Sequence, residues 1–126
     1  MRGVDTNVLV RLLARDDEVQ QAAAEIFIGT GAWVSHLVLA ETIWVLDSVF
    51  ERSSAEIARA LEMLLTHDKL SIEDPEVVSA ALTQFRNKPR LGFSDCLILE
   101  IARKAGHLPL GTFDRNLSKL DGAQRL

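Results

Sequence analysis

Features of a secreted or membrane protein are scarce in this sequence. It contains one cysteine, Cys96, so no internal disulfide can form and a reducing compartment is acceptable. The first residues are mixed and charged, and no apolar run is long enough for a signal peptide or a membrane span. We therefore expect a cytoplasmic protein with no membrane partner. Because Cys96 has apolar neighbours, we expect it in the core and not as a catalytic thiol.

Motifs of several common enzyme classes are also missing. There is no glycine-rich phosphate loop, no Gly-x-Ser-x-Gly elbow and no dinucleotide fingerprint. His36, His67 and His107 lie far apart and lack the spacing of transition-metal ligands. Repeats, linkers and low-complexity segments are absent as well. The sequence therefore predicts one domain over residues 1–126, which is long enough to bury a core without crosslinks.

The net charge of −4 hides an asymmetry along the chain. Residues 1–84 carry six Lys or Arg against fourteen Asp or Glu, whereas residues 85–126 carry eight against four. A basic loop that contains Arg86, Lys88 and Arg90 begins this second part. Scattered positive charge is usually solvated surface, so this pattern permits a polyanionic partner without requiring one.

Apolar spacing and capping residues predict alternating strands and helices, which is typical of an α/β sandwich. A helix is expected directly behind Asp5, and Ser53 with Glu56 has the form of a capping box. The acids of residues 16–18 suit the dipole of a helix start better than a metal site. Strands are expected at residues 1–4, 32–35, 69–73, 108–112 and 123–126, and further helices at 16–28, 37–50, 53–66, 74–87 and 93–106. In the last helix, we expect Leu97, Ile98, Ile101 and Ala102 to face inward.

Four acids stand where a plain surface acid is not expected. Asp5 and Asp114 each follow a β-prone run and precede a helix, and in a parallel sheet such residues lie at the ligand-binding edge. Glu41 has apolar residues three and four positions away on both sides, where a carboxylate is costly unless it is paired, bound or solvated. Asp95 lies in the first turn of its helix. Each could be only a cap, a dipole partner or a solvated residue, but four together exceed what independent caps predict.

Four carboxylates brought together would repel one another and raise each other's pKa unless a divalent cation lay between them. Oxygen ligands suit hard cations such as Mg²⁺ or Mn²⁺. Such an ion can activate water as a nucleophile and neutralise charge that builds on a phosphoryl group. The acids therefore favour a Mg²⁺ or Mn²⁺ site.

The acids lie within four ordered motifs, separated by 36, 54 and 19 residues. The motifs are Val4-Asp5-Thr6-Asn7-Val8-Leu9-Val10-Arg11, Leu39-Ala40-Glu41, Phe93-Ser94-Asp95-Cys96-Leu97-Ile98 and Thr112-Phe113-Asp114-Arg115-Asn116-Leu117. Together they resemble the PIN-domain family over nearly the whole chain, in particular the VapC toxins of bacterial toxin–antitoxin pairs. The resemblance implies a three-layer α/β/α sandwich with a central parallel sheet of four to five strands.

The resemblance also implies a function, a Mg²⁺- or Mn²⁺-dependent endoribonuclease that is the toxin of a type II toxin–antitoxin pair. The implied catalytic and metal-holding residues are Asp5, Glu41, Asp95 and Asp114. Thr6 and Asn7 would orient the Asp5 loop, and Thr112 would support Asp114. The implied partners are RNA, a VapB-type antitoxin and a second copy of the chain. We expect RNA to be positioned by Arg11, Arg15, Arg86, Lys88, Arg90 and Arg115, and the apolar helix of Trp44 is our candidate dimer surface.

Two features depart from the family pattern. The first strand, residues 1–4, has few apolar residues, so we expect a frayed or exposed start of the sheet. Gly111 stands in the strand before Asp114 where a larger residue is common, which bears on local packing.

Two other classes of protein share some of these features. A phosphoacceptor receiver domain would need a pair of acids after the first strand, whereas Asp5 stands alone. A catalytically inactive PIN-like module that binds RNA or protein remains the alternative, although such a module has no need of a costly acidic cluster.

Overall fold

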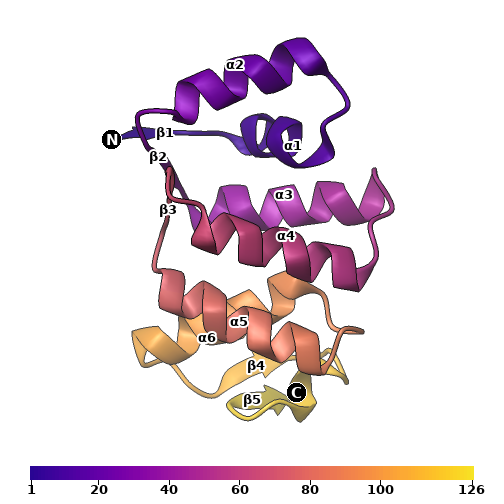
Figure 1. Ribbon diagram of the computed structural model, residues 1–126. Coiled ribbons are helices and arrows are strands. Elements are labelled where there is room, and N and C mark those ends of the chain that lie inside the picture. Colours follow the sequence, from indigo (N-terminus) through magenta and orange to yellow (C-terminus); the bar gives the residue numbers. More distant parts are fainter. The chain divides into compact units, whose positions relative to one another are not determined.

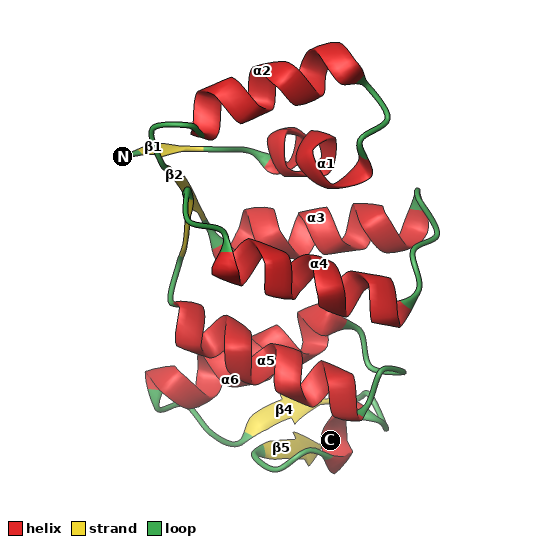
Figure 2. Ribbon diagram, viewed as in Figure 1, coloured by secondary structure: helices red, strands yellow, loops and turns green.

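The computed structural model describes residues 1–126, in which five strands and six α-helices follow one another along the chain. The chain forms two compact units, unit 1 (Met1–Pro75) and unit 2 (Glu76–Leu126). In both units, short parallel strands alternate with helices (Figures 1 and 2). The α/β class predicted from the sequence is confirmed. No helix is both long enough and apolar enough to cross a membrane.

Unit 1 is built on a parallel sheet with the strand order β1-β2-β3. In the central strand, Ala32 and Val34 are buried, whereas Trp33 on the other face is partly exposed. Because parallel strands point the same way, their carboxyl ends share one edge, and Asp5 follows the first of them. The strands are β1 (Arg2–Gly3), β2 (Ala32–Val34) and β3 (Leu70–Ile72).

Every helix of unit 1 begins at a side-chain cap. The capping side chains of Asp5, Asp17, Ser35 and Ser53 each accept a hydrogen bond from the backbone amide three residues later. The predicted capping box of Ser53 and Glu56 is confirmed, and Asp17 caps its helix as the acidic start predicted. The helices are α1 (Thr6–Ala14), α2 (Glu18–Ile28), α3 (His36–Ser48) and α4 (Ser54–Thr66).

The core of unit 1 lies between these helices and the sheet. Leu9 of α1, Leu39 of α3 and Leu61 and Leu64 of α4 are almost fully buried. Helix α1 packs against both α2 and α3. The start of α1, and with it Asp5, is therefore held by apolar packing on two sides.

Unit 2 contains α5 (Pro75–Asn87), which begins at the last residue of unit 1, α6 (Phe93–Ala105), β4 (Leu110–Thr112), a short 3₁₀ turn (Leu117–Lys119) and β5 (Ala123–Arg125). The two strands pair in parallel. Phe85 of α5 and Phe93 of α6 contact edge to face, with ring centroids 6.2 Å apart. Helix α6 ends at Gly106, whose φ of 83° is the left-handed conformation that glycine adopts without strain.

Five strands are present, as the fold prediction requires. Hydrogen bonds join β1, β2 and β3 within unit 1, and β4 pairs with β5 within unit 2. Each strand has only two or three residues, so each offers few backbone groups for pairing. β1 is the shortest, in line with the short first strand expected from residues 1–4.

Asp74, which was expected to cap α5, has a left-handed φ of 46°. The predicted inward face of α6 was wrong in part. In α6, Leu97 is buried, but Ile98 and Ile101 are 50% and 37% exposed. The buried face is instead formed by Phe93, Cys96, Leu97, Leu99 and Glu100. An acid was not expected on that face, and its partner is described below.

Candidate metal centre

Asp5 follows β1 and caps α1 with one of its two oxygens. Its Oδ1 accepts a hydrogen bond of 3.3 Å from the Val8 amide. The other oxygen, Oδ2, makes no hydrogen bond to the protein, and the residue is exposed. Capping and metal binding are therefore compatible roles for this carboxylate, since each needs a different oxygen.

Glu41 lies on α3 and is tied to the turn that follows Asp5. The Thr6 hydroxyl donates a hydrogen bond of 2.8 Å to Glu41 Oε2, which leaves Oε1 without a protein partner. Glu41 is exposed, and so are Leu37 and Trp44 on the same face of α3. Unit 1 thus brings Glu41 against the residue next to Asp5, and the Thr6 hydroxyl that links them restricts the Glu41 side chain.

Asp95 and Asp114 form the corresponding pair in unit 2. Asp95 lies in the first turn of α6 and is partly buried. Burial raises the pKa of the Asp95 carboxyl above its ordinary value, and the negative charge of Asp114 raises this pKa further. The two carboxylates therefore repel each other, which is the condition that a bound cation would relieve.

Asp114 is held at the end of β4 by two hydrogen bonds. Its backbone amide donates to Thr112 Oγ1 at 3.0 Å, and its Oδ1 accepts a bond of 2.8 Å from the Leu117 amide at the start of the 3₁₀ turn. Asp114 Oδ2 has no protein partner. As with Asp5, one oxygen closes a turn and the other is free.

The raised pKa of Asp95 predicts a pH-dependent effect on stability. We expect Asp95→Asn to raise the melting temperature in EDTA at pH 7. A carboxyl whose pKa is higher in the folded than in the unfolded state binds its proton more tightly when folded, so stability is lost as the pH rises through the folded pKa. The gain from Asp95→Asn should vanish below about pH 4, where Asp is protonated even in the unfolded chain. Thermal unfolding followed by circular dichroism between pH 3 and 7 measures this, and a variant no more stable than the wild type at pH 7 contradicts it.

Cys96, beside Asp95, takes no part in this chemistry. It is fully buried, and burial raises the pKa of its thiol to about 11. Asp95 and Glu100 add to this rise in pKa through their negative charge. A thiol with this pKa is protonated at neutral pH and is a weak nucleophile. The expected core position of Cys96 is confirmed.

The basic residues proposed to contact RNA differ in their exposure to solvent. Arg11 Nη1 lies 2.6 Å from Asp16 Oδ1, so the charge of Arg11 is already paired. Arg15 is exposed at the end of α1 with a left-handed φ of 57°. The remaining basic residues of the prediction are all exposed: Arg86, Lys88, Arg90 and Arg115.

The donor set of the four acids suits a hard divalent cation. All candidate ligands are carboxylate oxygens, which Mg²⁺ and Mn²⁺ prefer over nitrogen or sulfur. Asp5, Glu41 and Asp114 each present an oxygen that no protein group occupies. Neither unit by itself places three or more acidic, histidine or cysteine side chains together as a metal site. Each unit therefore contains one pair of candidate ligands.

Two further acids have partners that the sequence analysis missed. Glu100 on α6 is only 7% exposed, and Arg103 Nε donates to its two oxygens at 3.0 and 3.3 Å. The spacing of an arginine three residues after an acid on an apolar face was the available signal. Glu73, after β3, accepts a 2.8 Å hydrogen bond from the His36 amide. No local pattern pointed to this contact, because 37 residues separate the partners.

Comparison with known families identifies the family of this chain. The PIN domain family model matches residues 4–123, a stretch that includes all four acids and runs through both units. The chain therefore belongs to the PIN domain family, a class of metal-dependent nucleases whose substrates are nucleic acids and whose usual cations are Mg²⁺ and Mn²⁺. No curated protein matches the chain.

Proposed function

We propose that this protein is a Mg²⁺- or Mn²⁺-dependent endoribonuclease and that residues 1–126 act as one PIN domain. In this proposal, Asp5, Glu41, Asp95 and Asp114 together hold the cation. The observation that carries it is that each unit supplies a pair of acids with unoccupied carboxylate oxygens, within a family match that spans both units. The family match that spans both units supports placing the two pairs of acids at one metal centre.

The chain's own residues divide the work of such a site. When bound, the cation would activate water and neutralise charge on the scissile phosphate. Thr6 fixes the Glu41 side chain through its hydroxyl, and Thr112 fixes the backbone at Asp114. Asn7 follows in the first turn of α1, where it would help to shape the loop around Asp5.

Phosphate contacts outside the acidic centre would come from the exposed basic residues Arg15, Arg86, Lys88, Arg90 and Arg115. Arg11 is a weaker candidate for phosphate than the sequence suggested, because Asp16 already neutralises its charge. An acidic pocket repels phosphate until a cation binds, so these residues would set the position of the RNA backbone.

The test is cleavage of total cellular RNA by the purified protein with Mg²⁺ or Mn²⁺, compared with EDTA. We expect new RNA ends only in the presence of metal, and mapping those ends would begin to define the target. If the protein binds metal in calorimetry but cuts no RNA, the alternative of a catalytically inactive PIN-like module gains support.

We further propose that the protein is the toxin of a type II toxin–antitoxin pair, restrained by a VapB-type antitoxin. The four motifs and their spacing, which resemble those of VapC toxins, support this role. Expression in a bacterial host tests it: the wild-type chain should arrest growth, and Asp5→Asn should not. Growth that continues with a chain proven active on RNA would argue for a nuclease of another biological role.

We also propose a homodimer formed through α3. Its exposed face includes Leu37 and Trp44, which are 69% and 64% exposed and flank Glu41. Large apolar residues that stay exposed on one helix face are typical of an interface.

A charge at the centre of such an interface should separate the dimer. We expect Trp44→Glu to weaken dimerisation by about 30-fold or more, since removing a hot-spot tryptophan costs about 2 kcal/mol or more. Sedimentation velocity at several concentrations measures this. Ile26→Glu on α2, also strongly exposed, is the matched control and should remain dimeric. A folded Trp44→Glu chain that sediments as the wild type does would exclude α3 as the interface.

A further inference from the structure

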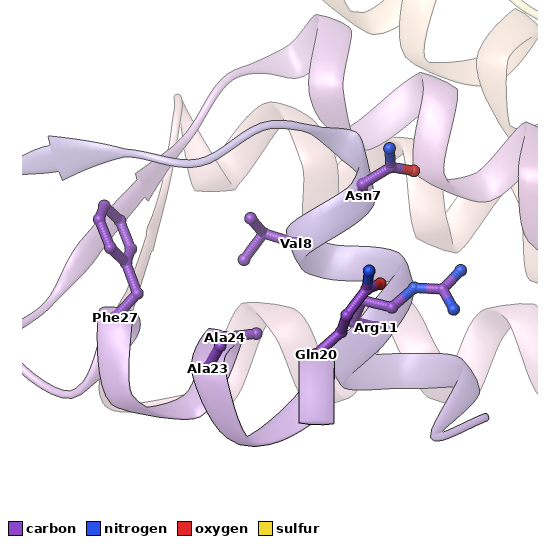
Figure 3. A pocket seen from close by; sticks show the side chains of 7 residues that line it. All are labelled: Asn7, Val8, Arg11, Gln20, Ala23, Ala24 and Phe27. Atoms are coloured by element: carbon purple, nitrogen blue, oxygen red, sulfur yellow. The ribbon is translucent and has the colours of Figure 1, made fainter. Parts of the chain in front are cut away.

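Helices α1 and α2 of unit 1 border a cleft of about 350 Å³ that is not part of the proposed metal centre (Figure 3). Its volume lies at the lower end of the range of roughly 300–1,000 Å³ that small-molecule sites occupy. Figure 3 shows Phe27 at one end of the cleft and Gln20 beside Arg11 at the other. The apolar side chains of Val8 and Ala24 lie between these two ends.

The charge balance of the cleft favours an uncharged ligand over a phosphate. Arg11 is the only charged residue that lines it, and its Nη1 is paired with Asp16 Oδ1 at 2.6 Å. Phosphate sites in nucleic-acid-binding proteins use positive charge that is free to replace counterions. The rest of the lining is apolar or carries neutral amides. The cleft therefore suits a flat, mostly apolar group with a polar edge.

The polar side chains that line the cleft can hydrogen-bond to the polar edge of a flat ligand. The side-chain amides of Asn7 and Gln20 make no hydrogen bond within the protein, so each offers both a donor and an acceptor. Amide side chains of this type hydrogen-bond to the edges of nucleobases. The polar end of the cleft, opposite Phe27, thus has unused hydrogen-bonding capacity.

Phe27 provides an aromatic ring whose position is fixed. The guanidinium of Arg2 lies 3.8 Å from the ring centroid, and Arg2 Nη2 donates to the Phe27 carbonyl at 3.1 Å. Proteins that bind single-stranded nucleic acid stack bases on aromatic side chains. The ring at one end and the amides at the other match the face and the edge of one nucleobase.

The cleft begins within one helical turn of Asp5. Val8, which lines it, donates its backbone amide to Asp5 Oδ1, and Asn7 lies between them in sequence. One turn of an α-helix rises about 5.4 Å. We propose that the α1–α2 cleft receives one nucleobase of the single-stranded RNA substrate, next to the phosphate that is cut. This inference rests on the proposed ribonuclease function and adds a determinant of base preference to it.

Binding can be tested without cleavage, by nuclear magnetic resonance in excess Mg²⁺ on the Asp5→Asn protein, which should not cut RNA. Penta-adenylate, penta-cytidylate and penta-uridylate are titrated into this labelled protein, and the side-chain amide signals of Asn7 and Gln20 are followed. We expect these signals to shift, with one pentamer binding roughly 10-fold or more tightly than another, the scale of a good hydrogen-bonded base contact. Titration with the free nucleoside monophosphates, which should bind more weakly, separates an RNA subsite from a site for free nucleotides.

A matched pair of variants on α2 locates the effect. Ala23→Leu places a larger side chain into the cleft, whereas Ala22→Leu places the same side chain on the exposed surface one residue away. Ala23→Leu should abolish the amide shifts and the difference between pentamers, and Ala22→Leu should retain both. The inference is overturned if no pentamer shifts these amides, if free monophosphates bind as tightly as RNA, or if Ala23→Leu binds as the wild type does. Loss of cleavage with intact base-selective binding would instead count against the proposed nuclease alone.

Discussion

The Asp5→Asn protein is expected to lose RNA cleavage by more than about 100-fold while keeping its fold. At metal sites, even residues that only support a ligand cost roughly 10–100-fold when they are replaced, and Asp5 is proposed to be a ligand itself. Asparagine removes the negative charge but keeps an oxygen at the position of Oδ1. Because asparagine caps helices about as well as aspartate does, the bond from the Val8 amide should persist.

The choice of asparagine separates chemistry from stability. Asp5→Ala would also remove the cap of α1, at a cost of about 1 kcal/mol, and loss of activity could then be blamed on the fold. Asp17→Asn is the matched control, since Asp17 caps α2 through the same type of bond, from the Gln20 amide at 3.0 Å. We expect Asp17→Asn to cut RNA as the wild type does. Cleavage rates on a labelled RNA, with melting temperatures measured alongside, decide the matter, and an Asp5→Asn chain that cuts at the wild-type rate would defeat the assignment.

The second large effect is expected at Arg103. We predict that Arg103→Ala lowers the free energy of unfolding by about 3 kcal/mol. Removal of one partner of a buried ion pair leaves the other charge without compensation, at a cost of roughly 3–5 kcal/mol. Glu100 is 7% exposed and would keep no partner among the remaining side chains. We place the effect at the low end because Arg103 itself is 34% exposed, so that water can reach the site.

Arg103 also holds the segment that leads into β5. Its Nη2 donates to the Asp121 carbonyl at 2.6 Å, and a Cβ on Gly122 would lie only 3.1 Å from that nitrogen. Gly122 has a φ of 93°, which also disfavours other residues. Since β5 pairs with β4, and β4 leads to Asp114, Arg103 supports the strand pair next to one of the candidate ligands.

Urea unfolding of the variants tests this role of Arg103. Arg52→Ala is the control, because its pair with Glu56, at 3.7 Å and open to solvent, should contribute little to stability. The double variant Glu100→Leu with Arg103→Leu should recover most of the loss, since an apolar pair leaves no charge unpaired. An Arg103→Ala chain as stable as the wild type would show that Glu100 is hydrated or differently paired.

The helices and their starting points were predictable from the sequence because their causes are local. A capping residue and the amide that it binds are three residues apart, so the Ser53 capping box and the Asp17 cap can be found in a short window. The strands were also found, since short β-prone runs followed by helix signals have few other interpretations. The pattern of alternation then leads directly to the α/β class.

Contacts between distant segments could not be predicted in the same way. The Thr6 hydroxyl on Glu41 joins residues 35 positions apart, and no local rule indicates that α1 and α3 meet there. The buried face of α6 was misassigned in part, since it includes Glu100, whose burial the ion pair with Arg103 makes possible. The Thr6–Glu41 contact lies beyond any local pattern, whereas the Glu100–Arg103 pair, three residues apart, was a local signal that was missed.

The local and distant interactions meet at the candidate ligands. Asp5 and Asp114 each cap a helical turn, as the simpler interpretation predicted. Each does so with one carboxylate oxygen and leaves the other available. A cap and a ligand are therefore not competing explanations at these positions. The order that capping gives to the carboxylate would lower the entropic cost of placing it around a cation.

The most direct test of the central claim is a calorimetric titration of Mn²⁺ into the wild-type protein, Asp5→Asn, Asp95→Asn and the control Asp17→Asn. If acids from both units hold one cation, the wild type and Asp17→Asn will bind Mn²⁺ alike, and both Asp5→Asn and Asp95→Asn will bind it about 10-fold or more weakly. A wild-type chain that binds no Mn²⁺, or a variant in either unit that binds it as tightly as the wild type, would contradict the proposed metal centre.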